Sequence, residues 1–136
     1  MTPRAARAAL LVLLAGAGRG VAGPALDYQL NCQGCHLSDG AGTAGSVPRL
    51  ADSVARFLAV PGGREYLARV PGVAQAPLDD AATAGVLNYI LEHFDHAHVP
   101  ADFVPYTAAE IGDLRKRPLT DVEKVRQGLL AVLERR

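Results

Sequence analysis

Apolar residues recur at intervals of three and four along the second half of the chain, which predicts amphipathic helices there. The strongest of these segments opens at Asp79 or Asp80, either of which can cap a helix, and it ends near residues 93–95. Its apolar face consists of Val86, Leu87, Ile90, Leu91 and Phe94. Weaker patterns predict short helices over residues 25–34, 52–58 and 64–70.

Two more helices are predicted beyond residue 106, each with its own start signal. Thr107 with Glu110 and Thr120 with Glu123 have the spacing of a capping box, in which both side chains bond to free N–H groups at the helix start. Pro118 separates the two helices. The second helix is amphipathic through Leu119, Val122, Val125, Leu129, Leu130 and Leu133.

The segments between the helices are rich in glycine and proline and predict loops, the longest over residues 37–47. Residues 73–77 are expected to be extended, because Ala76 precedes a proline and is pushed out of the helical region. These elements predict an all-α fold. We expect a domain over residues 24–95 and a two-helix extension over residues 96–136 that packs on it, with a partner-binding surface as the alternative use of the extension.

The first 23 residues have the pattern of a secretory signal peptide. Arg4 and Arg7 precede an apolar run over residues 8–17, and small residues follow at positions 20–23. A ten-residue helix rises about 15 Å, about half the hydrocarbon thickness of a membrane. Cleavage near Ala22 or Gly23 is therefore expected, and no membrane span remains after it.

Charge and composition indicate which kinds of molecule the chain is suited to bind. The whole chain carries 14 basic and 14 acidic residues, and loss of three arginines with the signal peptide would leave 11 basic residues and a net charge of −3. With no basic stripe and no tryptophan, the chain does not fit nucleic-acid binding. A chain of about 113 residues has only a marginal core unless a large apolar cofactor completes it.

The residues that carry chemistry are Cys32-Gln33-Gly34-Cys35-His36. Two thiols separated by two residues, with an imidazole directly after them, form the attachment signature of a c-type haem. Both thiols can form thioethers with one porphyrin, and His36 then becomes the proximal iron ligand. A disulfide, a redox dithiol or half of a zinc site could use the same thiols, but the chain has no second cysteine pair and no βαβ pattern around the motif.

With this motif, the chain from about residue 25 to 94 resembles the class I c-type cytochromes. Pro48, twelve residues after His36, matches the family proline whose carbonyl accepts the N–H of the proximal imidazole. The resemblance implies a small cytochrome c fold around one covalent haem c, held by Cys32 and Cys35. It implies a periplasmic carrier of single electrons without catalytic residues, whose partner is a redox protein such as a periplasmic dehydrogenase or oxidase.

The chain departs from this family at the sixth iron ligand. Members usually place a methionine before the last family helix, but the only methionine here is Met1. We expect His98 as the distal ligand, followed by His96 and Gln75, with an open or water-bound position as the alternative. An open position would favour binding of a small ligand such as NO or CO, in a sensor or a subunit of a redox enzyme complex. Arg64 is the expected partner of a haem propionate.

Overall fold

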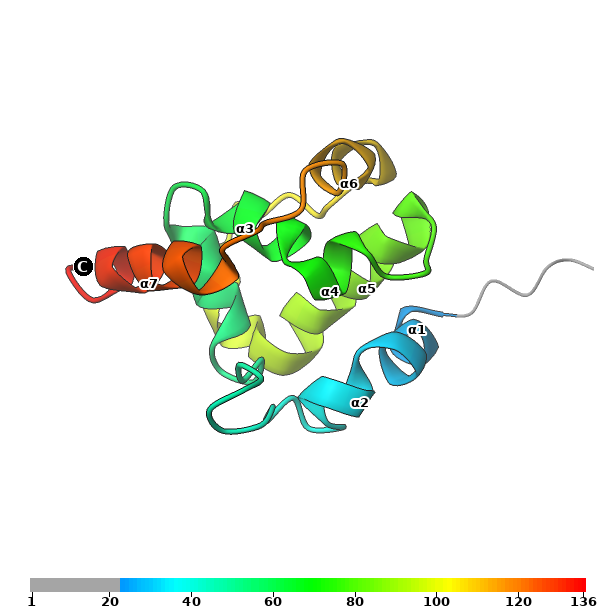
Figure 1. Cartoon of the computed structure of the whole chain (residues 1–136), viewed down its shortest axis with the longest axis horizontal. Helices are drawn as coiled ribbons and strands as arrows, with labels where there is room; N and C mark the ends of the chain where they lie inside the picture. The colour runs from blue at the N-terminus through cyan, green and yellow to red at the C-terminus, as the bar shows by residue number, and fades with distance from the viewer. Residues whose placement is uncertain (1–22) are drawn as a thin grey trace, which may run out of the picture.

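A computed structural model describes residues 23–136 as short helices gathered around one long helix, α5 (Figure 1). The α-helices are α1 Pro24–Asn31, α2 Gln33–His36, α3 Gly63–Arg69, α4 Pro71–Ala74, α5 Asp80–Asp95, α6 Ala108–Leu114 and α7 Val122–Leu133. Two 3-10 helices are η1 Val54–Ala59 and η2 His96–His98. Within residues 23–136 no strand forms, and a lone bridge pairs Thr43 with Val47. The prediction of an all-α fold is confirmed.

The signal peptide expected over residues 1–23 lies outside the described part of the chain, apart from Gly23. From residue 23 onward, none of the helices combines the length and the apolar character needed to cross a membrane.

Helix α1 packs against α5 through an aromatic cluster. The Tyr28 side chain of α1 is buried, and its ring centroid lies 4.9 Å from that of Phe94 and 6.1 Å from that of Tyr89. The Tyr28 hydroxyl donates to the carbonyl of Leu37 at 2.5 Å. This bond ties the end of α2 to the packed pair of helices.

Helix α5 begins where its sequence pattern indicates. The carboxylate of Asp79 accepts a hydrogen bond from the N–H of Ala82 at 2.7 Å, as expected of a helix cap. The face turned to the core is formed by Thr83, Ala84, Val86, Leu87, Ile90, Leu91 and Asp95. The predicted apolar face therefore forms the centre of the fold, except that Phe94 stays half-buried.

The helix predicted over residues 52–58 is the 3-10 helix η1, and its cap comes from a distant residue. The buried carboxylate of Asp95, at the end of α5, accepts from the N–H of Ala55 at 2.7 Å. The predicted caps, Asp52 and Ser53, do not supply this bond. Because Asp95 lies 40 positions from Ala55 in the sequence, no pattern near η1 indicates that Asp95 caps this helix.

The prediction of an extended segment over residues 73–77 is wrong, because α4 covers Pro71–Ala74. Pro71 occupies the first position of this helix, where the missing N–H has no helical partner to lose. The restriction from Pro77 reaches only the residue before it, Ala76, which lies beyond the end of α4.

Both helices of the extension bury residues in the same core as α5. Thr107 caps α6 by accepting from the N–H of Glu110 at 3.2 Å, and the Ile111 side chain of α6 has no exposed surface. Helix α7 packs on η1 and α3. Its cap is Asp121, which accepts from the N–H of Lys124 at 3.2 Å, so the expected cap Thr120 is off by one residue.

Hydrogen bonds from polar side chains also join the extension to the domain over residues 24–95. Asn88 on α5 donates to the carbonyl of Tyr106 at 3.0 Å and accepts from its N–H at 2.8 Å. Arg115, which follows α6, donates to carbonyls between α4 and α5 at 3.1, 2.7 and 2.7 Å, those of Ala74, Ala76 and Leu78. The extension therefore fixes the conformation of the loop between α4 and α5.

Replacement of Ile111 by alanine tests how far the extension stabilises the fold. Ile111→Ala leaves a cavity in a fully buried position, and it should lower the free energy of unfolding by about 2–5 kcal/mol in urea titrations. The matched control is Val104→Ala in the same extension, where the side chain is 68% exposed and the change should stay within about 0.5 kcal/mol. Equal effects of the two substitutions would contradict the packing described above.

Candidate functional site

The segment Cys32-Gln33-Gly34-Cys35-His36 lies where the path of α1 breaks and α2 begins. The break falls at Cys32, with φ −125° and ψ −37°, so the single helix predicted over residues 25–34 is divided in two. The N–H groups of Cys35 and His36 both donate to the carbonyl of Cys32, at 3.2 and 3.0 Å. This turn places both thiols and the imidazole on the lining of one cavity.

The two thiols differ in their surroundings. Cys32 is half-buried and Cys35 is exposed, and neither forms a disulfide. Burial raises the pKa of Cys32, and the nearby Asp27 carboxylate and Cys35 thiol act in the same direction. The Cys32 thiol is therefore protonated at neutral pH.

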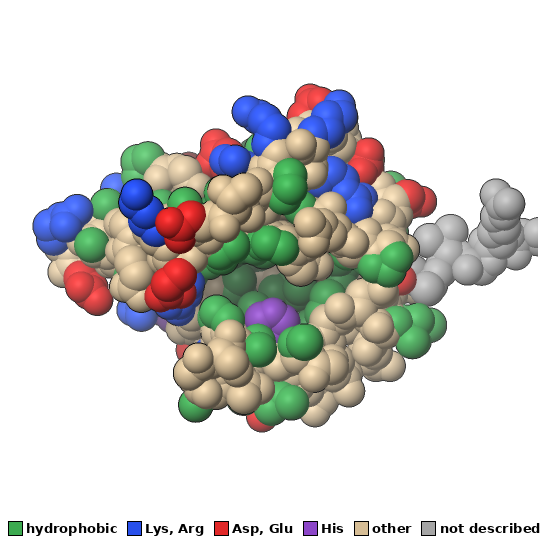
Figure 2. Space-filling view, in the orientation of Figure 1, with side chains coloured by type: hydrophobic (Ala, Val, Ile, Leu, Met, Phe, Trp, Pro, Cys, Tyr) green, Lys and Arg blue, Asp and Glu red, His purple; other side chains and the backbone are tan. Residues whose placement is uncertain are grey.

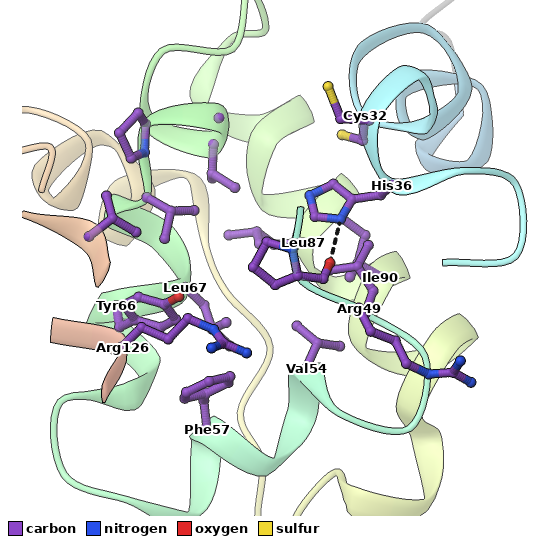
Figure 3. A pocket seen from close by; sticks show the side chains of 18 of the residues that line it. Cys32, His36, Arg49, Val54, Phe57, Tyr66, Leu67, Leu87, Ile90 and Arg126 are labelled. Carbon is purple, nitrogen blue, oxygen red and sulfur yellow. Dashed lines mark hydrogen bonds between the residues drawn. The ribbon is translucent and has the colours of Figure 1, made fainter. Parts of the chain in front are cut away.

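A backbone carbonyl orients the imidazole of His36. Its Nδ1 lies 3.1 Å from the carbonyl oxygen of Pro48, to which it donates (Figure 3). This bond places the ring proton on Nδ1 and leaves the lone pair of Nε2 free to bind a metal. Burial lowers the pKa of His36, and the bond to Pro48 opposes that shift in part. The neutral form of His36, which is the form that can ligate a metal, is therefore favoured.

Gly42 lets the loop after α2 bring Pro48 to His36. Its N–H donates to the carbonyl of His36 at 3.1 Å, and its φ is +68°, in the left-handed region. A Cβ at this position would collide with the carbonyl oxygen of Val47 and would lie 2.7 Å from that of Pro48. Gly42 is thus a functional residue that the sequence analysis treated only as part of a loop.

A cavity of about 330 Å³ opens beside His36 and is lined mostly by apolar side chains (Figure 3). Val54 and Phe57 of η1, Leu67 of α3, and Leu87 and Ile90 of α5 contribute to its walls. On the surface the cavity is visible as a hollow with green side chains and one histidine inside it (Figure 2). Such an apolar cavity with a few polar groups is typical of cofactor sites.

One cationic side chain on the cavity lining has a nitrogen that forms no hydrogen bond with the described residues. Arg126, from α7, lines the cavity, and its Nε is buried without a hydrogen-bond partner among the described residues. A second hollow of about 450 Å³ adjoins the first, and Pro48, Arg49 and Arg126 line both. Two thiols, an oriented imidazole, apolar walls and an unpaired guanidinium fit a haem, which is apolar in its plane and carries carboxylates on one edge.

Arg64, the expected propionate partner, does not line this cavity. Its Nε and Nη2 donate to the carboxylate of Glu110 at 2.6 and 2.7 Å, and its Nη1 donates to the carbonyl of Val104 at 2.8 Å. The guanidinium also lies 4.2 Å from the ring centroid of Tyr106. Arg64 therefore holds the extension on α3, and its bond to a haem propionate stays a prediction.

The expected distal ligands also lie outside the cavity lining. Nδ1 of His98 bonds to the buried Asp95 carboxylate at 2.5 Å, and Nδ1 of His96 bonds to Glu92 at 2.6 Å. Gln75 is exposed. The structure does not bring His98, His96 or Gln75 to the cavity, and in the described part of the chain no cluster of three or more His, Cys, Asp or Glu residues could hold a metal.

Residues 70–73 line the cavity just before the segment where the family methionine was expected, residues 73–77, and they bring no metal-ligating side chain. They are Val70, Pro71, Gly72 and Val73. Of the described residues on the lining, His36 carries the one imidazole. Burial raises the pKa of Tyr66, another lining residue, so its hydroxyl stays protonated and neutral.

Comparison with known proteins finds sequence similarity to two proteins, both from Thermus thermophilus. Cytochrome c-552 of Thermus thermophilus is 38% identical over 107 residues, which cover 65% of this chain and 82% of the relative. Cytochrome c-552 from a named strain of Thermus thermophilus is also 38% identical over 107 residues, with 72% of the relative covered. No protein-family model matches the chain.

The pair of Arg64 and Glu110 predicts a specific dependence of stability on pH. Hydrogen bonds from Arg64 lower the pKa of Glu110 below its ordinary value of 4.5, with burial opposing. Because the folded-state pKa is depressed, the pair stabilises the fold above the ordinary pKa, and this contribution is lost as pH falls through the lowered pKa.

Glu110→Gln should therefore reduce the free energy of unfolding by about 1 kcal/mol at pH 7 and by clearly less at pH 3. Urea unfolding at both pH values measures this difference. Glu134→Gln, at an exposed position of the same extension, serves as the control and should change neither value by more than about 0.5 kcal/mol. A deficit of Glu110→Gln that is the same at both pH values would contradict the proposed pairing.

Proposed function

Because the chain belongs to the c-type cytochromes, the family of cytochrome c-552, we propose that it is a periplasmic carrier that passes single electrons between redox proteins. The cofactor of this family is one covalently bound haem c. When bound, the haem supplies an iron that accepts and releases one electron, while the protein contributes binding, orientation and electrostatics. On this proposal no residue is catalytic.

The observation that carries the proposal is the hydrogen bond from His36 to Pro48 at the mouth of an apolar cavity. Cys32 and Cys35 would hold the haem through thioethers, and His36 would present Nε2 to the iron. Pro48 would keep the ring in that orientation and make the imidazole a stronger donor. These roles agree with the way each side chain is placed on the cavity.

The cavity walls support a role in electron transfer over one in bond-making chemistry. Val54, Phe57, Leu67, Leu87 and Ile90 offer no acid or base, and they give the site apolar walls. A low-dielectric surrounding controls the reduction potential of a haem. Cys35 is exposed, so a haem bound to it would have an edge near the surface, where an electron can pass to a partner.

Sequence features support our proposal for the compartment and for the partner. The signal peptide expected over residues 1–23 would export the chain, and export suits a partner such as a periplasmic dehydrogenase or oxidase. The net charge of −3 for the chain without this segment favours a protein partner over nucleic acid. The chain could serve as a free carrier or as a haem subunit of a dehydrogenase complex.

A second function has one specific observation in its favour. The wall formed by Val70, Pro71, Gly72 and Val73 offers the iron no side-chain ligand. An iron held by His36 alone would keep its sixth position open to water or to a small ligand such as NO or CO. The protein would then act as a ligand sensor or as the ligand-binding subunit of a redox enzyme complex.

The attachment of haem is tested by the mass and extractability of the cofactor. Protein exported by cells that mature c-type cytochromes should carry the mass of one haem on a chain beginning near Gly23 or Pro24, and acid acetone should not extract it. Cys32→Ala with Cys35→Ala should abolish the covalent mass, whereas Ser38→Ala, three residues beyond the second thiol, should retain it. Haem that acid acetone removes from the unmodified protein would refute covalent attachment.

The state of the sixth position is tested by absorption spectra. If the second function is right, the unmodified protein should be high-spin when reduced and should bind CO at once, because none of the three candidate ligands lines the cavity. His98→Ala, His96→Ala and Gln75→Ala should leave the spectrum unchanged. A low-spin spectrum that one of these substitutions converts to high-spin would show that the loop or the helix end rearranges around the haem, and would favour the electron carrier over the ligand-binding protein.

A further inference from the structure

The guanidinium of Arg126 points toward the cavity from α7 (Figure 3). Its Nε is the one buried side-chain nitrogen or oxygen in residues 23–136 that lacks a hydrogen-bond partner. A buried polar atom without a partner destabilises a fold, and the effect is larger for a charged group. A group that enters the cavity and accepts a hydrogen bond would satisfy this atom of Arg126.

The neighbours of Arg126 within the chain do not fill this role. Glu123, one turn earlier on α7, accepts a hydrogen bond from Gln127 at 2.6 Å. The ion pairs formed by residues 23–136 do not include Arg126. Tyr66 and Arg126 line the same side of the cavity (Figure 3), and the charge of Arg126 opposes the rise in the pKa of Tyr66 that burial causes.

The apolar cavity and the second hollow meet at Arg126. Pro48, Arg49 and Arg126 line both spaces, and the second is lined also by Thr43, Ser46 and Glu123. A group that fills the apolar cavity and projects its polar edge outward would place that edge between the two arginines. Arg49 already pairs with Asp52 at 3.0 Å and donates from Nε to the carbonyl of Ala51 at 2.7 Å. Arg126 is therefore the arginine of the two that is free for an anion.

We propose that Arg126 is a positioning residue that binds a haem propionate, so that the extension supplies the anion-binding group of the site. The inference rests on the proposed function, because it needs a haem in this cavity. A guanidinium matches a carboxylate with two parallel hydrogen bonds, and Nε is one of the donors in that arrangement. The bond would satisfy the buried Nε and would fix α7 on the cavity.

The cation also has an electrostatic consequence. A positive charge beside the haem opposes the extra positive charge of the oxidised iron and so favours the reduced state. Neutralising Arg126 should lower the reduction potential. A guanidinium that was merely structural and far from the haem would leave the potential unchanged.

The experiment compares the reduction potentials of the haem-loaded full chain and three variants. Arg126→Gln should shift the potential downward, and Arg126→Lys, which keeps the charge but not the planar fork, should restore part of the shift. Arg135→Gln is the matched control, because it removes the same charge from an exposed position of the same extension. Equal potentials for Arg126→Gln and Arg135→Gln overturn the inference.

Nuclear magnetic resonance of the unmodified haem protein gives a second readout that needs no variant to fold. The Nε–H of Arg126 should exchange slowly with solvent, and its signal should differ between the oxidised and reduced states, while that of Arg135 should exchange fast in both. Fast exchange at Arg126 overturns the inference even if Arg126→Gln cannot be produced. A chain that holds no haem at all would refute the proposed function instead, which separates the two failures.

Discussion

The hydrogen bond between His36 and the carbonyl of Pro48 depends on the whole path of the chain between them. The chain must leave α2 and return within 12 positions, which requires a close approach of backbone to backbone at Gly42. The start of the loop is held by the bond from Tyr28 to the carbonyl of Leu37, and Tyr28 is itself held by its packing on α5. The orientation of one imidazole is therefore set by contacts that reach from α1 to α5.

The extension takes part in the site as well as in the core. Val122 and Arg126 of α7 line the cavity, and Arg115 fixes the loop between α4 and α5. Arg64 and Asn88 also hold the chain between α5 and α6, through the carbonyls of Val104 and Tyr106. A cavity that needs walls from both ends of the described chain is complete only when the extension has packed.

The features that sequence reasoning located correctly depend on neighbours in the chain. Asp79 caps α5 because its side chain reaches an N–H three residues ahead, and the apolar face of α5 follows from helical spacing alone. The spacing of His36 and Pro48, which the hydrogen bond between them bears out, is a local pattern of the same kind. Their geometry could be expected before any tertiary contact was known.

The features that sequence reasoning missed depend on residues far apart in the chain. Asp95 caps η1 across 40 positions and at the same time bonds to His98, whose imidazole therefore does not line the cavity. Arg64 finds Glu110 across 46 positions. The sequence does not single out Arg126. Helical spacing identifies the apolar face of α7, but it does not indicate which charged residue of that helix lines a cavity.

The same long-range contacts determine which side chains could reach the sixth position of a bound haem iron. For Gln75 to reach the cavity, the loop around it would have to turn over, but Arg115 holds the flanking carbonyls of Ala74 and Ala76 and also that of Leu78. Hydrogen bonds to a charged group contribute about 1.5–3 kcal/mol each, so breaking three would cost several kcal/mol. For His98 to reach it, Asp95 would lose a partner while its carboxylate stays buried. Both rearrangements must be offset by the bond that the new ligand makes to the iron, and the strength of that one bond therefore determines whether the protein keeps an open sixth position.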